Sequence, residues 1–414
     1  MRRTSGGCTR ELVQNSGRRT RASLGAEGAV VAMGAVIGGW GWFADVAWFE
    51  RHLHSYRCLH DEHALHVVST WRWGAAICAA LLVVVVRPMV GRLVARHGLP
   101  SFGALARCGV AVIMSLVVTE VYLRKPWKTA PPPGECSFCP PVTTSDGYRW
   151  FLVPSTEHRW NPGGREVVYA VDAEGNRAPS VGFVADHERP TILVAGESIA
   201  LGMGVRYEET FSALLEARLG VQVVDLGVHG FGLDQAYLRA EEEIALYARP
   251  LALVMLFVPE QATRSEAEDR GRLRAGPGGE LVRVPAAPAW IREIRLRSLL
   301  LHTLPSHGDA EVEDMRAVVR ATVALAKKRG VMPYFLATNF DQACMKLDGK
   351  EAWIYRTLFT DQGVAHAVVD LPLDLRVAPE EPHPGAEAHR RLADAVERAL
   401  RDAHVVDASA SRAE

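Results

Sequence analysis

The stretch that most constrains the fold of this chain is TILVAGESIALGMG, from Thr191 to Gly204. Its run of β-branched and apolar residues predicts a buried strand, which ends abruptly at the small turn Gly196-Glu-Ser198. The segment 208–219 follows with apolar side chains at helical spacing, so we expect a helix there. A serine in a turn between a strand and a helix can hold its hydroxyl beyond the sheet edge as a nucleophile.

Strands and helices alternate through the rest of this region. We expect strands at 191–195, 221–226, 251–258, 331–337 and 366–370. The expected helices span 208–219, 233–247, 311–329, 351–362 and 384–403. Such alternation requires a mostly parallel sheet covered by helices on both faces, with its functional site at the carboxyl ends of the strands. Four segments fall at those ends, namely 196–198, 227–230, 259–261 and the stretch after Asp370 that reaches His383.

The first third of the chain carries three apolar segments, at 28–48, 73–86 and 108–123. With its flanks each approaches the roughly 20 residues that span a bilayer; a buried core helix is the alternative, most of all for the short third segment. Arginines gather before the first segment and between the second and the third. The positive-inside rule places both arginine-rich regions in the cytoplasm. Three crossings would then put everything after Leu123 on the extracytoplasmic side.

These patterns divide the chain into six regions. We expect a basic cytoplasmic N-terminus at 1–27, a transmembrane region at 28–123, a Pro-rich linker at 124–147, a small β-rich lead-in at 148–190, the α/β domain at 191–403 and a disordered tail at 404–414. The 47 basic and 48 acidic residues balance, so no bulk charge indicates a nucleic-acid partner. The partner that the apolar segments predict is the lipid bilayer.

Cysteine and histidine clusters outside the α/β domain are weak indicators of a bound group. The seven cysteines are too sparse for a disulfide scaffold. For Cys136 and Cys139 in the linker, a local disulfide or a bond to Cys58 is the favoured interpretation on an extracytoplasmic side. Several histidines in the loop 51–67 have a spacing that could bind a metal, but a solvated loop is favoured because no paired ligand signature surrounds them. We therefore expect no metal and no cofactor.

Three motifs follow one another in the second half of the chain: GESIALGMGV, VVDLGVHGFGLDQ and EEPHPGAEAHRRLADAV. In order and spacing they resemble blocks I, II and V of the SGNH (GDSL-type) hydrolases, and the similarity covers about residues 148–403. The resemblance implies a three-layer, flavodoxin-like α/β domain with a parallel sheet. With about three transmembrane helices in front, it is similar to the membrane-anchored bacterial type.

The resemblance also implies roles for individual residues. Ser198 matches the nucleophile, His383 matches the base, and Glu380 stands three residues before that base, where the family usually has aspartate. The backbone N–H groups of Ser198 and Gly230 match the oxyanion donors. The chemistry is coherent, because a serine hydroxyl needs an imidazole to take its proton and the imidazole needs a carboxylate to fix its tautomer. Glu381 competes with Glu380 for that last role.

Three local features bear on this site. The GDS of the family has become Gly196-Glu-Ser198, a mild change because the acid is not the nucleophile. The block III asparagine donor would fall near Glu260, and an ionised carboxylate cannot donate; losing one such donor costs about 10²–10³ in rate. Gln261 is the nearest amide that could substitute. Pro384 at a first helical position would place His383 at the N-cap of the closing helix.

Together these features predict a membrane-anchored serine esterase or acyl hydrolase on the extracytoplasmic side. Its substrate would be an ester-linked acyl group, for which anchoring suggests a cell-envelope glycan or lipid. Two alternatives stay open. An acyltransferase would pass the same acyl-serine to a sugar hydroxyl, and a catalytically weakened SGNH-like protein would bind a glycan or a partner. Nucleotide binding is disfavoured because neither GxGxxG nor GxxxxGK[ST] occurs.

Overall fold

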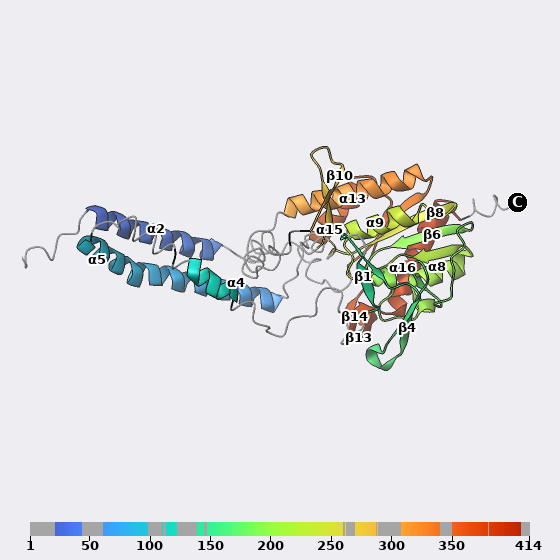
Figure 1. Ribbon diagram of the computed structural model, residues 1–414, viewed down its shortest axis with the longest axis horizontal. Coiled ribbons are helices and arrows are strands. Elements are labelled where there is room, and N and C mark those ends of the chain that lie inside the picture. Colours follow the sequence, from blue (N-terminus) through green and yellow to red (C-terminus); the bar gives the residue numbers. More distant parts are fainter. Residues whose placement is uncertain are drawn as a thin grey trace, which may run out of the picture. The chain divides into compact units, whose positions relative to one another are not determined.

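The computed structural model describes residues 21–43, 61–97, 110, 113–121, 139–144, 147–259, 261, 270–286, 288, 308–339, 350–379 and 381–406. The chain forms two compact units. The described residues up to 121 belong to a helical unit, and those from 139 onward belong to an α/β unit (Figure 1).

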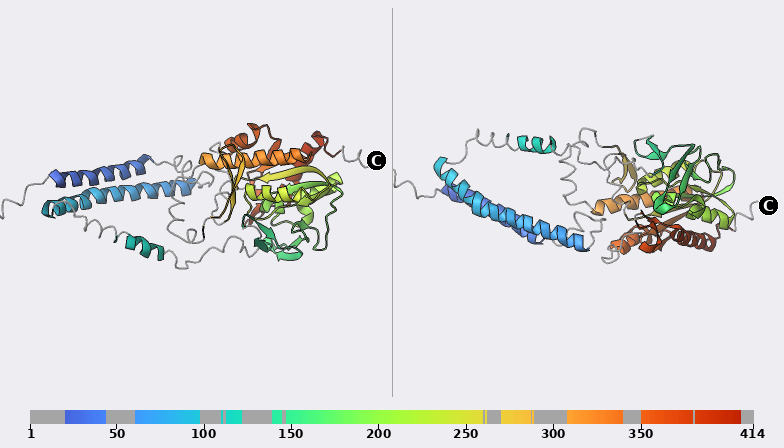
Figure 2. Two further views of the ribbon diagram at one scale, coloured as in Figure 1. Left: turned by 45° about the horizontal axis from the view of Figure 1, so that its top comes forward. Right: turned by 90° about the horizontal axis from the view of Figure 1, so that it is seen from below.

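The helical unit is built on an antiparallel pair of long helices. One is α2 (Arg21–Phe43), and the other is a continuous helical stretch made of α4 (Asp61–Leu81), η1 (Leu82–Val86) and α5 (Arg87–His97). The two lie side by side along their length, as both views of Figure 2 show. Small residues line their contact: a Cβ on Gly41 would lie 2.3 Å from the Cβ of Ala75, and one on Gly38 would lie 3.4 Å from that of Ala79. The glycines therefore permit the close backbone approach that is typical of helix pairs in membranes.

Two helices of this unit are long and apolar enough to cross a membrane. They span Ser23–Phe43, with a mean hydropathy of 1.3, and Val68–His97, with a mean hydropathy of 2.1. Only 17% and 11% of these windows are buried, which disfavours a soluble core helix. The third predicted segment, 108–123, is helical at Val110 and at 113–121 but does not reach that length within the described residues. Two of the three predicted spans are thus supported by length and composition, and the third is not.

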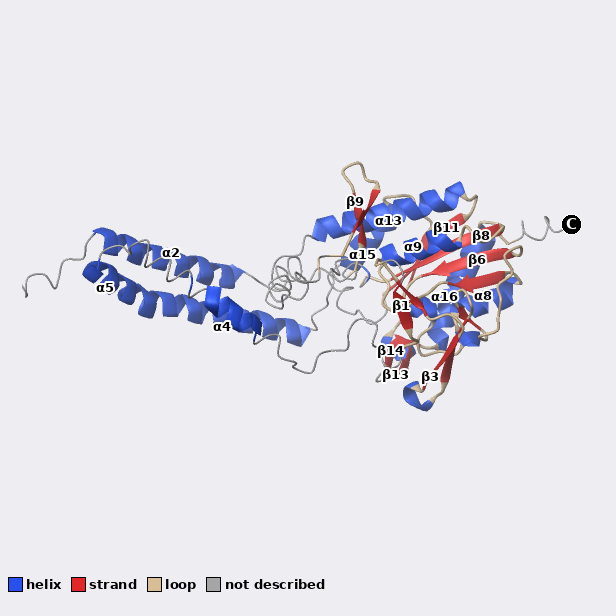
Figure 3. Ribbon diagram, in the orientation of Figure 1, coloured by secondary structure: helices blue, strands red, loops and turns tan. Residues whose placement is uncertain are grey.

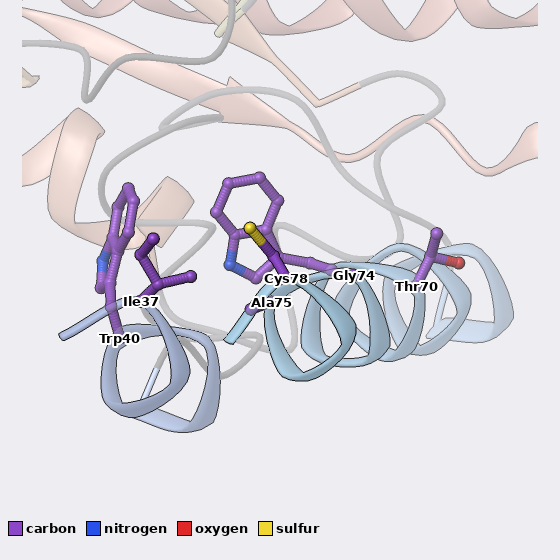
Figure 4. A pocket seen from close by; sticks show the side chains of 7 residues that line it. Ile37, Trp40, Thr70, Gly74, Ala75 and Cys78 are labelled. Atoms are coloured by element: carbon purple, nitrogen blue, oxygen red, sulfur yellow. The ribbon is translucent and has the colours of Figure 1, made fainter. Parts of the chain in front are cut away.

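Polar and apolar contacts both join these helices. Arg87 Nε donates to Oε2 of Glu27 at 3.1 Å, which pairs a buried carboxylate of α2 with the start of α5. Toward the other end, Trp40 and Trp71 meet edge to face with their ring centroids 5.5 Å apart. A cavity of about 700 Å³ lies beside them and is lined by Ile37, Trp40, Thr70, Trp71, Gly74, Ala75 and Cys78. Figure 4 shows side chains of this lining.

The α/β unit is organised around one sheet of eight strands in the order β12-β11-β8-β6-β7-β5-β4-β3. Five strands are parallel: β6 (Pro190–Ala195), β7 (Gln222–Asp225), β8 (Arg249–Phe257), β11 (Met332–Thr338) and β12 (His366–Val369). Numbered along the chain, these five follow the order 2-1-3-4-5, which is the flavodoxin-like order. The predicted doubly covered parallel sheet is therefore present, within a larger mixed sheet.

The predicted lead-in is part of the same sheet. Its strands β3 (Thr156–Trp160), β4 (Val167–Val171) and β5 (Arg177–Ala178) pair antiparallel, and Arg177 in turn pairs antiparallel with Asp225 of β7. Before them, β1 (Val142–Thr144) and β2 (Trp150–Leu152) form a separate hairpin. The lead-in strands therefore extend the main sheet beyond β7.

Helices cover both faces of the sheet, as Figure 3 shows. Alternate residues of β6 point to opposite faces, so Leu193 joins one hydrophobic cluster while Ile192 and Val194 join the other. The first cluster includes α9 (Leu233–Glu243), α13 (Gly308–Lys328), α15 (Lys350–Tyr355) and η4 (Arg356–Thr360). The second includes α8 (Phe211–Leu219) and α16 (Ala386–Asp402). Burial on both faces explains the nearly continuous apolar runs of the central strands.

The start of the closing helix differs from the prediction. The helix α16 begins at Ala386 with Gly385 as its N-cap, two residues later than the expected start at Pro384. The preceding residues form β14 (Glu381–Pro384), which pairs antiparallel with β13 (Arg376–Ala378). The prediction that His383 occupies a helix N-cap is therefore wrong, because strand pairing holds this segment in an extended conformation.

A buried histidine ties α16 to α8. His389 is fully buried; its Nδ1 accepts a hydrogen bond from the backbone N–H of Phe211 at 3.2 Å, and its ring stacks on that of Phe211. Burial, together with the positive charges of Arg177 and His383, lowers the pKa of His389 to about 3. The folded chain therefore holds this imidazole neutral at a pH where an unfolded chain would protonate it.

This shift predicts acid sensitivity. The pKa of a histidine in the unfolded chain is about 6.5, so between pH 6.5 and 3 the unfolded state binds more protons and stability falls as the pH drops. At pH 5 this one group lowers the free energy of unfolding by on the order of 2 kcal/mol relative to pH 8. Asp225, whose pKa burial raises to about 6, acts in the opposite direction between about pH 4 and 6.

The test is the urea unfolding of the full chain in detergent at pH 8 and pH 5. His389→Asn keeps an acceptor for the Phe211 N–H but does not titrate. The free energy of unfolding of this variant should therefore fall less between pH 8 and pH 5 than that of the unchanged chain. Because the comparison uses each protein's own difference between pH 8 and pH 5, any constant loss from the substitution cancels. If the free energy of unfolding fell equally in the two proteins, His389 would not be the source of the acid sensitivity.

Candidate active site

Ser198 stands directly beyond the carboxyl end of β6, as predicted, but it opens a short helix that the sequence pattern did not predict. It is the first residue of α7 (Ser198–Leu201), its side chain is buried, and Glu197 is the N-cap, whose Oε1 accepts from the Ile199 N–H at 2.8 Å. Gly196 makes the tight approach possible, since a Cβ there would lie 2.9 Å from the Cβ of Leu256 on β8. The strand therefore delivers the serine hydroxyl to the carboxyl edge of the sheet.

The lead-in holds the other end of α7. Arg177 of β5 is buried and donates to the carbonyl oxygens of Leu201, of Gly202 at 2.6 Å and of Val205 at 2.7 Å. Its guanidinium also lies 4.6 Å from the ring centroid of Tyr169. These bonds satisfy carbonyl groups that the end of a short helix leaves without partners. Arg177 could not be predicted from the sequence, because nothing in the local pattern links β5 to this turn.

His383 reaches Ser198 from β14. Its Nε2 lies 2.9 Å from Oγ of Ser198, although the two residues are 185 positions apart. Its other ring nitrogen, Nδ1, contacts Oε1 of Glu381, and the same oxygen accepts from the backbone N–H of His383 at 3.1 Å. Serine, imidazole and carboxylate thus form one continuous chain of hydrogen bonds, the arrangement that activates a serine.

Glu381 is the carboxylate in contact with His383. Residues two apart on a strand point to the same face, so position 381 shares a face with position 383. Partial burial raises the pKa of Glu381, but the hydrogen bonds and charge of His383 outweigh it and bring the pKa below its ordinary value. Glu380, the carboxylate expected from the resemblance, lies outside the described residues. This alternation could not be used on the sequence, where a helix start was expected at Pro384, so Glu381 was only an alternative to Glu380.

A second acceptor stands beside the Ser198 hydroxyl. Oε2 of Glu197 accepts a hydrogen bond from Ser198 Oγ, while Oε1 of the same carboxylate caps α7. A hydroxyl carries one proton, so it donates either to Glu197 or to His383 at any moment. The glutamate of the Gly196-Glu-Ser198 turn therefore places a carboxylate directly against the serine, and the hydroxyl proton must turn toward His383 before the imidazole can take it.

Two backbone N–H groups, those of Ser198 and Gly230, have no acceptor among the described backbone carbonyls. Ser198 opens α7, where N–H groups have no partner within the helix. Gly230 has φ 76, which favours glycine, in a turn closed by the Phe231 N–H on the Val228 carbonyl at 3.3 Å. A bond from the Val228 N–H to the Gly196 carbonyl, 3.3 Å long, joins this turn to the serine turn. Among described backbone acceptors, neither the Ser198 nor the Gly230 N–H has a partner. Both can serve as oxyanion donors.

The block III position is only partly described. Glu260 lies outside the described residues. Gln261 is fully buried, and its Oε1 accepts from the Val258 N–H at 3.2 Å just beyond β8. Its amide oxygen is thus used to close the end of the strand, and a donor role for Gln261 stays a prediction. The histidines of the loop 51–67, which were considered as metal ligands, have side chains outside the described part of the chain. The same holds for Cys58 and Cys136, which were considered as disulfide partners of Cys139.

His229 adds a neutral imidazole to the site. Within the described part of the chain its buried ring nitrogens have no hydrogen-bond partner. Burial lowers the pKa of His229 to about 4; the carboxylate of Glu197 opposes the shift, and the charges of His383 and His158 add to it. The ring therefore stays neutral at pH 7, with one nitrogen that donates and one that accepts.

No protein-family model matches the chain, and no curated protein matches it. Among solved structures, a putative lipolytic protein of the G-D-S-L family from Desulfitobacterium hafniense DCB-2 is 14% identical over 50% of this chain and 98% of its own, with a TM-score of 0.30. A family two carbohydrate esterase from Clostridium thermocellum, in complex with cellohexaose, is 10% identical over 54% and 67%, with a TM-score of 0.33.

A third similar structure is an acetyl xylan esterase (Est2A) from the rumen bacterium Butyrivibrio proteoclasticus. It is 12% identical over 54% of this chain and 66% of its own, with a TM-score of 0.31. The similar structures are thus GDSL-type lipolytic proteins and carbohydrate esterases. Because identity and TM-score are this low, the case for function rests on the geometry around Ser198.

Proposed function

We propose that this chain is a serine ester hydrolase in which Ser198 is the nucleophile, His383 the general base and Glu381 the carboxylate that orients His383. The observation that carries the proposal is the 2.9 Å separation between Nε2 of His383 and Oγ of Ser198, with the opposite ring nitrogen on Glu381. A nitrogen at that distance can accept the hydroxyl proton directly. The lowered pKa of Glu381 keeps it ionised at neutral pH, where it holds the proton of the imidazole on Nδ1.

The reaction proceeds in two halves. Ser198 Oγ bonds to the ester carbonyl carbon while its proton passes to Nε2 of His383, and the carbonyl oxygen becomes an oxyanion near the N–H groups of Ser198 and Gly230. The carbon–oxygen bond to the alcohol then breaks, and the alcohol leaves with the proton from Nε2. A water molecule repeats the sequence on the acyl-serine, which releases the acid and restores the hydroxyl.

The ester in question, we propose, belongs to a cell-envelope glycan or lipid. The support for this substrate class is the attachment of the α/β unit to a chain with two apolar helices long enough to cross a membrane. A hydrolase tethered to a bilayer meets substrates at the membrane surface or in the envelope around it. Transfer of the acyl group to a sugar hydroxyl would use the same acyl-serine with a different acceptor.

We further propose that the hydrolase domain faces the extracytoplasmic side. Cys139 is disulfide-bonded, and its partner lies outside the described residues. Disulfides persist in oxidising compartments and are rare in the cytosol. Two crossings after a cytoplasmic N-terminus would return the chain to the cytoplasm, so this location requires a third crossing, for which the helical residues around 113–121 are the candidate.

A fluorophosphonate probe tests the serine chemistry and the extracytoplasmic location in one experiment. In detergent extracts the full chain should be labelled and Ser198→Ala should not, because the probe phosphonylates only an activated serine. In intact cells a probe that cannot cross the membrane should label the chain equally well. An unlabelled folded protein in extracts would refute the serine chemistry. Labelling in extracts but not in intact cells would refute only the location.

A further inference from the structure

The lead-in contributes a tryptophan to the turn that carries the candidate oxyanion donor. Trp150 begins β2, in a hairpin where it pairs with Thr144 of β1. Its indole Nε1–H donates to the backbone carbonyl of His229 at 3.0 Å, across 79 residues of sequence. The ring of Trp150 also meets that of Phe231 edge to face, with centroids 5.7 Å apart. One side chain from the lead-in thus holds both the backbone and a side chain of the turn.

The bonded carbonyl belongs to the peptide that ends in the Gly230 N–H. The carbonyl of His229 and the N–H of Gly230 lie in one planar unit, and the chain has no cis peptide among its described residues, so the two groups point in opposite directions. Whatever fixes the direction of the His229 oxygen therefore fixes the direction of the Gly230 hydrogen. The Trp150 bond sets the carbonyl on one side of the turn and leaves the N–H on the other.

The peptide between His229 and Gly230 can adopt either of two opposite orientations, depending on the type of turn. The bond from the Phe231 N–H to the Val228 carbonyl closes a four-residue turn, and Gly230 at its third position has φ 76 while His229 is not among the residues of positive φ. That combination defines a type II turn. A type I turn has the same closing bond but its central peptide, here the one between His229 and Gly230, is turned over. The two forms would aim the Gly230 N–H in opposite directions.

We propose that Trp150 is a positioning residue of the active site: its indole N–H holds the 229–230 peptide in the type II form and thereby aims the Gly230 N–H at the developing oxyanion. This inference rests on the proposed serine hydrolysis. The close packing fits the role, because a Cβ on Gly230 would lie 3.2 Å from Cζ2 of Trp150, so the ring closes against the turn. The lead-in is then part of the catalytic apparatus as well as of the sheet.

Trp150→Phe tests the inference, since it keeps an aromatic ring on the turn and removes the N–H donor. With p-nitrophenyl acetate and the full chain in detergent, kcat per active site should fall by about 10- to 100-fold, while KM changes less than about threefold. Loss of a whole oxyanion donor costs about 10²–10³, and a turn that still samples the type II form loses less. Trp160→Phe is the matched control, because it removes another half-buried lead-in indole.

A transition-state analogue separates positioning from a general loss of structure. Phenylboronic acid forms a tetrahedral adduct on the serine, so its inhibition constant should rise in Trp150→Phe by about the factor by which kcat falls. Active sites are counted by fluorophosphonate titration, so an unfolded fraction does not enter the rates, and Trp150→Tyr repeats the test in a second background. Rates per site equal to those of Trp160→Phe, or an unchanged inhibition constant, would overturn the inference. Absence of Ser198-dependent labelling in the unchanged chain would instead overturn the proposed hydrolysis itself.

Discussion

Replacing Ser198 or His383 by alanine should each lower kcat for an ester substrate by about 10⁴- to 10⁶-fold, and the double variant should be no slower than the worse single one. The reason is that the two side chains act as a unit across a 2.9 Å contact. Without the imidazole the hydroxyl keeps its proton, and without the hydroxyl the imidazole has nothing to activate. What remains is the activity due to binding and the oxyanion donors alone.

The measurement is a double-mutant cycle on kcat, with the wild-type chain and the three variants purified in the same detergent. Thermal unfolding of each variant shows whether the fold is kept. Additive losses, in which the double variant is slower by the product of the two factors, would mean that Ser198 and His383 act independently. A His383→Ala variant that keeps most of the activity would point to Glu197, the other acceptor on the Ser198 hydroxyl.

The nucleophile turn could be predicted because its signals are local. A strand buried on both faces must be apolar throughout. The residue after it must be glycine, because a Cβ on Gly196 would lie only 2.9 Å from the Cβ of Leu256. The turn with Gly230 follows the next parallel strand and ends at the same edge of the sheet. Spacing in the sequence therefore predicted two elements of the site, and the structure brings the predicted base to within 2.9 Å of Ser198.

The surroundings of His383 could not be predicted from the same kind of pattern. Proline two residues before Ala386 is a common start for a helix, and helical spacing continues after it. The segment is instead paired with Arg376–Ala378, so a tertiary contact overrides the local preference. That single difference changes which glutamate faces the imidazole, because a strand alternates its side chains whereas a helix start does not.

The hydrogen bonds that the lead-in makes to the two turns could not be predicted from the sequence either. Trp150 and Arg177 contact carbonyl groups of the two turns from 79 and 24 or more residues away. Contacts of that kind leave no periodic trace, since a single donor on a short strand is sufficient. The lead-in was predicted as a small β-rich segment, and it does consist of short strands. In addition, its side chains form hydrogen bonds with the turn at Gly230 and with the end of α7.

The choice between the two glutamates leads to the sharpest substitution test. Glu381→Gln should lower kcat by about 10⁴-fold while leaving the fold intact, because an amide cannot hold His383 in the tautomer that accepts a proton on Nε2. Glu380→Gln is the matched control and should change kcat by less than about threefold. The two substitutions are chemically identical and adjacent in sequence, so their difference reports only which carboxylate contacts the imidazole.

Thermal unfolding distinguishes this role from a structural one. In the unchanged chain the ionised Glu381 stabilises the imidazolium that forms as Ser198 attacks, so Glu381→Gln should lose activity while it unfolds at about the same temperature as the unchanged chain. A large loss of kcat for Glu380→Gln and a small one for Glu381→Gln would transfer the role to Glu380. A loss of kcat in Glu381→Gln that comes with a clearly lower unfolding temperature would mean that Glu381 supports the fold of β14 and has no direct effect on the base.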